Sequence, residues 1–189
     1  PFMDCRNLKE VDINANLTSW EEESAFEGCT SLKRVTFGGI VPEIPQRAFY
    51  NCSNLDEVQL SEGLETIHNN AFYGCSSLKK IVLPGTVTAI EYAAFSGCSE
   101  LKSFAFPEGV ETIADSTFAD CTNLESIYIP KSLNFVYGTA FTNCKKLKKV
   151  FYEGDPLEWR KINSGVIPRV IDDIEHVYQA DYADFLAKQ

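Results

Sequence analysis

The sequence predicts a solenoid, a linear stack of short coils around one continuous core. A phenylalanine, a cysteine and a leucine recur at fixed offsets, almost always 23 residues apart, and a period of roughly 20 to 50 residues is typical of solenoids and related arrays. The copies follow one another without an interval long enough for a linker. They begin at Phe26, Phe49, Phe72, Phe95, Phe118 and Phe141, and Phe2 begins a seventh, clipped copy.

All seven cysteines lie three residues after these phenylalanines, at one phase of the repeat. Stacked strands lie about 4.8 Å apart, whereas the Cβ atoms of a disulfide prefer roughly 3.5 to 4.5 Å and a particular dihedral angle. The pattern therefore favours buried free thiols that act as small hydrophobic residues. The alternatives have less support. A metal site is not favoured because the sequence has no CxxC pair and no histidine near the cysteines, and a catalytic nucleophile is not favoured because no matching base is present. Cys5, in the clipped copy, is left uncovered and could oxidise between molecules.

Each copy contains one predicted strand, illustrated by residues 78–83. Apolar residues alternate at its end, which is strand periodicity, and Pro84 ends it because proline cannot donate to a ladder. Val87 and Ile90 then belong to a return stretch on the opposite side of the coil. The following residues, 93–95, include good helix formers and predict a short helical turn that leads to the next cysteine.

Residues 153–189 break the period and are predicted to form a C-terminal cap, in one structural unit with the array of residues 1–152. Asp155, Pro156 and Glu158 suit the N-cap, N1 and N3 positions of a helix. This helix is expected to end near Ile162 and to bury Trp159 against the last coil.

The end of the cap is predicted to contain a strand over residues 175–179 and a final helix. Asp181 can serve as its N-cap. Tyr182, Phe185 and Leu186 then share one helical face.

Composition excludes several partner classes. Hydrophobic residues make up 44% of the chain, but no apolar run approaches the roughly 18 residues of a membrane span, so we expect no direct membrane insertion. A net charge of -10 argues against a nucleic-acid partner, because phosphate backbones select basic surfaces. The chain begins inside a repeat, as a trimmed fragment would, so the lack of a signal peptide says nothing about localisation.

Charge is unevenly distributed between the two sides of the predicted coil. The seven segments from each cysteine through the strand contain 11 bases and 6 acids, whereas the six return segments contain 2 bases and 10 acids. An acidic protein therefore has a basic strand face. One interpretation is an anionic or acidic partner on that face, and the other is a solubilising pattern that prevents aggregation. The outward lysines that would make the contacts are Lys79, Lys80, Lys102, Lys148 and Lys149.

A further outward column changes from polar to apolar along the axis and reads Asp12, Thr36, Gln59, Val82, Ala105, Tyr128 and Phe151. Tyr128 and Phe151 beside lysines resemble the aromatic and cationic mixture of interface anchors. Alternatively, these residues are good strand formers, or the cap folds over Phe151. On the interface reading, replacing Tyr128 and Lys148 with alanine should abolish binding without altering stability.

Catalytic and metal chemistry have little support. His68 has no acid or nucleophile spaced for a triad, and His176 falls in the predicted terminal strand. Asp172 and Asp173 could bind a cation, although a solvated loop explains them as well. Phosphate-loop, GxSxG and HExxH motifs do not occur. We therefore expect no enzyme activity, no metal and no cofactor.

The pattern of Leu78, Ile81 and Leu83 matches the strand half of a leucine-rich repeat. The usual asparagine-ladder position does not fit, since it holds Ile40, Gly63, Thr86, Gly109 and Ser132. With Ala-Phe-x-x-Cys-x-x-Leu upstream and Leu-Pro-x-x-Val-x-x-Ile downstream, residues 2–152 resemble the BspA-like leucine-rich repeats, and residues 151–162 resemble the segment that closes such arrays. The resemblance implies a right-handed β/α superhelix and surface or secreted proteins of host-associated bacteria and some protists, often credited with adhesion. It implies no catalytic residues.

These observations predict a non-catalytic leucine-rich-repeat module of an exported bacterial surface protein. Its expected partner is a protein or glycan, host-derived if the module is an adhesin, and its expected state is a monomer at the cell surface or outside the cell. The alternative function is a structural spacer that projects another domain. The candidate ligand-binding residues are Lys79, Lys80, Lys102, Tyr128, Lys148, Lys149 and Phe151.

Overall fold

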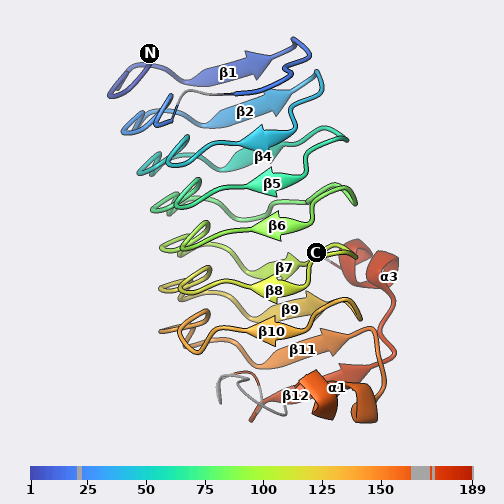
Figure 1. Ribbon diagram of the computed structural model, residues 1–189. Coiled ribbons are helices and arrows are strands. Elements are labelled where there is room, and N and C mark those ends of the chain that lie inside the picture. The colour runs from blue at the N-terminus through green and yellow to red at the C-terminus, as the bar shows by residue number, and fades with distance from the viewer. Residues whose placement is uncertain (21–22, 163–170, 172, 189) are drawn as a thin grey trace.

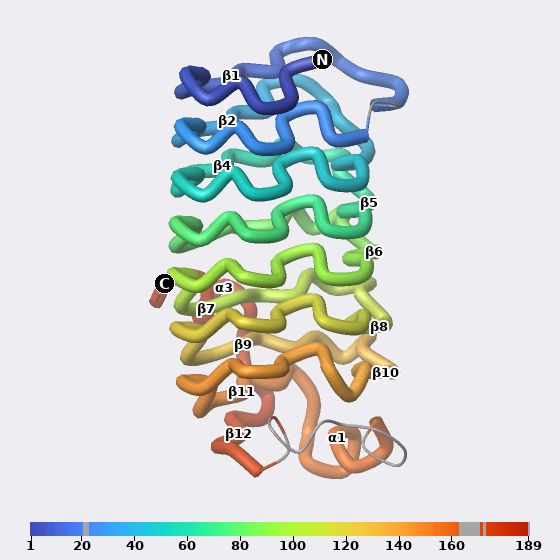
Figure 2. Tube along the Cα trace, turned by 90° about the vertical axis from the view of Figure 1, so that its left-hand side faces the viewer, coloured from blue at the N-terminus to red at the C-terminus, as the bar shows by residue number. Residues whose placement is uncertain are grey.

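The computed structural model describes residues 1–20, 23–162, 171 and 173–188. The chain winds into about seven coils that stack along one axis, with the first coil at one end and helix α1 (Pro156–Ile162) at the other (Figure 1). Each coil has a strand face and an opposite return face, which occupy the left and right sides of Figure 2. The predicted solenoid is confirmed.

The strand face is built from parallel strands whose equivalent residues lie side by side. Val35 pairs with Val58, and Ile127 pairs with Val150. Alternate residues point into the core, as the period of two requires. One sheet contains β1 (Glu10–Ile13), β2 (Arg34–Phe37) and β4 (Glu57–Gln59), and the other contains β7 (Ser103–Ala105), β9 (Ser126–Ile129), β11 (Lys149–Tyr152) and β12 (Glu175–Tyr178).

The strand predicted over residues 78–83 is not formed, and the strand face is interrupted there. Ile81 and Leu83 are buried and Val82 is 43% exposed, so the side chains alternate as predicted. Within the described chain, however, residues 79–83 form no backbone hydrogen bond with the coil on either side. The prediction was wrong because alternation reports which side chains are buried, whereas a strand also requires hydrogen-bonded neighbours.

The return face also consists of two short parallel sheets. Its strands are only two residues long, and each buries its second residue, such as Ile67 or Ile113. One sheet contains β3 (Glu43–Ile44), β5 (Thr66–Ile67) and β6 (Ala89–Ile90), and the other contains β8 (Thr112–Ile113) and β10 (Phe135–Val136).

The turns between the return face and the cysteines are not helical, which corrects the prediction of short helical turns. Their backbone bonds span three residues, as in Ala48 N–H to the Pro45 carbonyl. Left-handed residues occur two positions before and two positions after the repeat phenylalanine, as at Asn70 and Gly74 around Phe72. A right-handed helix cannot continue through such residues.

The phenylalanines and cysteines form a continuous ladder along the edge that joins the two faces. The rings of Phe2 and the six later repeat phenylalanines stack with centroids 5.3–5.6 Å apart and planes within 2–12°. Six cysteines are buried free thiols, and Cys5 is partly exposed. Each buried thiol donates to a phenylalanine carbonyl in the preceding coil, as Cys75 Sγ does to Phe49 O at 3.2 Å. The cysteine is therefore a small core residue that also joins successive coils.

The cap begins with α1 after the last coil. Asp155 Oδ1 accepts from the Leu157 and Glu158 amides at 2.7 and 2.9 Å, and Glu158 Oε2 accepts from the Asp155 amide at 2.9 Å. This is the reciprocal pattern of a capping box. Trp159 is buried with its ring centroid 5.2 Å from that of Tyr152.

After α1, β12 pairs with β11, and the chain then reverses into helix α3 (Tyr182–Ala187). Asp181 caps this helix by accepting from the Asp184 amide at 2.9 Å. Figures 1 and 2 show α3 beside the strand face near β7. None of the described helices has the length and apolar character needed to cross a membrane.

Candidate functional site

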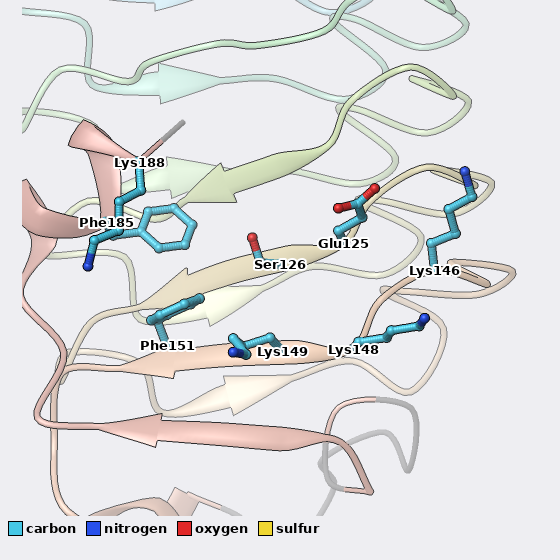
Figure 3. Close-up of a pocket in the computed structure, with 8 residues that line it drawn as sticks. All are labelled: Glu125, Ser126, Lys146, Lys148, Lys149, Phe151, Phe185 and Lys188. Atoms are coloured by element: carbon cyan, nitrogen blue, oxygen red, sulfur yellow. The ribbon is translucent and has the colours of Figure 1, made fainter.

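Three of the predicted site residues meet at a cleft on the strand face. Lys148, Lys149 and Phe151 come from β11 and the residue before it, and the cleft has a volume of about 470 Å³. We call it the lysine cleft. It is lined by Glu125, Ser126, Lys146, Lys148, Lys149, Phe151, Phe185 and Lys188 (Figure 3).

The strand geometry determines which side chains enter the lysine cleft. Lys149 pairs with Ser126 and Phe151 pairs with Tyr128 in the β11–β9 ladder, so the side chains of Lys149 and Phe151 point to the same outward side. Figure 3 shows Phe151 near Phe185 at one end of the cleft, and Glu125, Lys146 and Lys148 at the other. The cleft therefore has an aromatic end and a charged end.

Four lysines and one glutamate make the lining of the lysine cleft cationic. Lys149 Nζ lies 2.8 Å from Glu175 Oε1 and 5.8 Å from the centroid of the Phe151 ring. Lys146 Nζ donates to Asn123 Oδ1 at 2.7 Å. Lys148 is exposed and makes no ion pair with any described residue. Exposed ion pairs contribute only about 0–1 kcal/mol, so an anionic ligand could replace the Glu175 contact at little cost.

Tyr128 is not available to a partner, which corrects its prediction as an interface anchor. It is 2% exposed, and its ring centroid lies 5.2 Å from that of Tyr182 and 5.7 Å from that of Phe185. Its hydroxyl donates to the Ala180 carbonyl at 3.4 Å, and burial raises its pKa. Because Tyr128 is in a packed cluster, replacing it would also lower stability, contrary to the sequence-based expectation.

The apolar part of the outward column is the docking surface for α3. Phe185 is 3% exposed and packs with Ala105 and Tyr128 in a cluster separate from the main core. The Phe151 ring meets the Phe185 ring edge-on at a centroid distance of 5.0 Å. The alternative that the cap folds over Phe151 is therefore correct, although Phe151 stays half-buried and still lines the lysine cleft.

The other predicted lysines do not reach the lysine cleft. Lys79, Lys80 and Lys102 are exposed, and of these Lys80 lines a different cleft of about 580 Å³ at the interruption of the strand face. Tyr182 and Leu186 of α3 also line that cleft. The predicted basic face is thus divided by the interruption and by α3.

Sequence reasoning missed Lys146, Lys188 and Phe185. The run of lysines around Leu147 was a signal for Lys146. For Lys188 and Phe185, the only signal was the apolar outward column, because apolar side chains on the strand face favour burial and the cap could cover them. Their position depends on where the chain reverses after β12.

His68 does have acidic neighbours, contrary to the sequence-based expectation. Its Nε2 lies 3.0 Å from Glu43 Oε2, and its Nδ1 lies 3.1 Å from Glu91 Oε2. Burial alone would lower the pKa of His68, but the hydrogen bonds to both carboxylates outweigh it and raise the pKa. The three residues come from successive coils, and Glu91 lies one 23-residue period after His68, so the repeat register contained a signal for this contact.

His176 and Asp173 do not line the lysine cleft. His176 packs against the Trp159 ring at a centroid distance of 4.7 Å. Across the described ranges, no three histidine, cysteine or acidic side chains are grouped to hold a metal ion. Of the predicted acidic pair, Asp172 lies outside the described residues, whereas Asp173 is exposed.

Similar solved structures are leucine-rich repeat proteins of bacteria. A leucine-rich cell surface protein from Faecalibacterium prausnitzii is 26% identical, with a TM-score of 0.57 over 76% of this chain and 47% of that one. A leucine-rich repeat protein from Bacteroides ovatus is 25% identical, with a TM-score of 0.60 over 77% and 48%. One from T. pallidum is 27% identical, with a TM-score of 0.59 over 85% and 78%. The chain spans about half the length of the first two.

The search of curated proteins found no match. The family comparison, in contrast, accounts for most of the chain. Six copies of the BspA type leucine rich repeat region match residues 1–99 and 42–162, which include every coil of the solenoid. The protein therefore belongs to the BspA type leucine rich repeat family.

Proposed function

We propose that the chain is a non-catalytic binding module of an exported bacterial surface protein, and that the lysine cleft binds anionic groups of a protein or glycan. The observation that carries the proposal is the convergence of Lys146, Lys148, Lys149 and Lys188 beside Phe151. Carboxylate or sulfate groups would contact the ammonium groups, and an apolar part of the ligand would cover the aromatic end. The cell-surface description of the Faecalibacterium protein supports a surface location, where such a module would act as an adhesin.

The test is a binding screen against immobilised host matrix proteins and sulfated glycans at two salt concentrations. Binding should weaken as salt rises, because a Debye length of about 10 Å at 0.1 M falls to about 3 Å at 1 M. The variant Lys148→Gln/Lys149→Gln should lose most of the binding. Lys9→Gln/Lys33→Gln is the matched control, since these exposed lysines lie at the other end of the strand face.

Matched ligands separate the two sources of anionic groups. A desulfated glycan that no longer binds would identify sulfate as the recognised group, whereas an acidic protein that binds alone would identify carboxylates. Equal loss of binding in both lysine variants would contradict the location of the site. If the wild-type protein bound none of these partners at low salt, the spacer function would be the better explanation.

A further inference from the structure

A cluster of exposed aromatic residues lies on the return face, away from the lysine cleft. Tyr92, Phe135 and Tyr137 are 50%, 39% and 47% exposed. The rings of Phe135 and Tyr137 meet edge-on at a centroid distance of 5.0 Å. Single exposed apolar residues are normal on protein surfaces, but exposed aromatic residues that line one groove, as Tyr92 and Tyr137 do, suggest a binding surface.

Tyr92 and Tyr137 border a groove because the coil between them carries small side chains. Thr112 and Ala114 lie on that coil, between the coils of Tyr92 and Tyr137. The groove has a volume of about 610 Å³, and its lining includes both tyrosines, both small residues, Glu91 and Glu111. We call it the tyrosine groove. It lies where β6, β8 and β10 follow one another on the right side of Figure 2.

The backbone hydrogen bonding changes beneath the tyrosine groove. On either side, Glu91 N–H donates to the Ile67 carbonyl at 2.9 Å, and Tyr137 N–H donates to the Ile113 carbonyl at 3.0 Å. The equivalent bond, from Ala114 to Ile90, is missing from the backbone hydrogen bonds of the described residues, and the two return sheets separate there. The Ala114 amide and the Ile90 carbonyl are thus not paired with each other, unlike the equivalent groups of the neighbouring coils.

We propose that the tyrosine groove binds a proline-rich segment in the polyproline II conformation. Tyr92 and Tyr137 are two coils apart, which corresponds to about 10 Å at roughly 4.8 Å per coil. A polyproline II helix has three residues per turn and rises about 3.1 Å per residue, so it repeats about every 9 Å. Successive turns can therefore place a proline against each tyrosine, and the solvated carbonyls of the segment can accept from the tyrosine hydroxyls. Aromatic-lined grooves recognise such segments in other proteins.

Charge indicates that the segment carries a basic residue. The groove is lined by Glu91 and Glu111, and its lining contains no lysine, arginine or histidine. Glu91 is already engaged by His68 Nδ1 at 3.1 Å, whereas Glu111 is exposed and makes no ion pair with another described residue. Glu111 is therefore the expected contact for an arginine or lysine. The charge preference is opposite to that of the lysine cleft, so the two sites can be tested separately.

The test uses three synthetic nine-residue peptides and ¹⁵N-labelled protein. The first peptide contains two Pro-x-x repeats and a terminal arginine, the second has glutamine in place of the arginine, and the third has alanine in place of the prolines. Chemical-shift changes should occur at Tyr92, Ala114 and Tyr137 with the first peptide. The third peptide should bind at least tenfold more weakly.

Variants of the groove provide the matched controls. Tyr92→Ala and Tyr137→Ala should each weaken the first peptide at least tenfold, whereas Tyr73→Ala should not, because Tyr73 stacks on Tyr50 outside the groove. Glu111→Gln should weaken the arginine peptide and leave the glutamine peptide unchanged.

Several outcomes would overturn the proposal. Equal binding of the proline and alanine peptides, or unchanged affinity in Tyr92→Ala and Tyr137→Ala, would exclude polyproline II recognition. Shift changes in the tyrosine groove with cellotetraose but not with the first peptide would assign the groove to an uncharged glycan. If Lys148→Gln/Lys149→Gln lost peptide binding and both tyrosine variants kept it, the peptide-binding site would be the lysine cleft.

Discussion

Replacing Phe185 with alanine should release α3 from the strand face while the array stays folded. Phe185 is 3% exposed and anchors a cluster that is separate from the main core. Truncating a buried phenylalanine costs about 3–5 kcal/mol, and a six-residue helix has no stability of its own in water. At about 1.4 kcal/mol per factor of ten, the local opening equilibrium should shift by about a hundredfold to a few thousandfold.

Native-state hydrogen exchange measures this opening directly. The amides of Phe185 and Lys188, which donate to the Asp181 and Phe185 carbonyls, should exchange faster by that factor. The amide of Leu101 in the array should stay better protected than the amides of α3, because the array need not unfold for α3 to open. Leu157→Ala is the matched control, since Leu157 is an apolar cap residue that is 65% exposed. Unchanged exchange at α3, or protection of α3 equal to that of Leu101, would refute a separately docked helix.

Three other measurements test features of the array. The raised pKa of His68 means that its pairing with the carboxylates stabilises the fold below the unfolded pKa of about 6.5, and that this stabilisation is lost as the pH rises through the folded pKa. In urea denaturation, the free energy of unfolding of the wild type should exceed that of His68→Gln by up to about 1 kcal/mol at pH 6 and by less at pH 8.5. A difference that does not change with pH would contradict this. Burial raises the pKa of Cys52 to about 12 and raises the pKa of most other thiols as well. A thiol reagent should therefore label Cys5 alone in the native protein and all 7 cysteines after denaturation. Rapid labelling of several thiols in the native protein would refute this prediction. Gly97 has a φ of +75°, and a Cβ there would lie 3.4 Å from Gly74 Cα. Gly97→Ala should therefore lower the free energy of unfolding by about 1–2 kcal/mol. An unchanged urea midpoint would argue against a left-handed conformation at this residue.

Much of the fold was predictable because the repeat constrains every coil in the same way. The recurring phenylalanine, cysteine and leucine identify the buried positions of each coil, and Phe72, Cys75 and Leu78 are each 0% exposed. The left-handed residues could also have been found, since the position before each cysteine holds glycine, asparagine or aspartate throughout the array. These residue types tolerate positive φ, so their recurrence argued against a helical turn.

The candidate site was less predictable because it depends on contacts between distant segments. The phase of the repeat placed Lys148 and Lys149 on the strand face correctly, but it contains no information about a non-repeating tail. The burial of Tyr128 follows from the reversal of the chain after β12, and its hydroxyl contacts Ala180, which is 52 residues away in sequence. The contact of His68 with Glu91 was predictable, in contrast, because Glu91 lies one 23-residue period after His68 and therefore at the same position of the next coil.

The interruption of both sheets has a mechanical consequence. Around residues 79–90 the strand ladder and the return ladder each stop, whereas the edge with the stacked phenylalanines continues through Phe72, Phe95 and Phe118. Here, among the described residues, the coils are joined by backbone hydrogen bonds along one edge but not across either face. Bending that separates the faces therefore meets less resistance than bending that separates this edge. The molecule should flex most easily in the middle, with the phenylalanine edge as the hinge line. Both the cleft beside Lys80 and the tyrosine groove would change width as it bends.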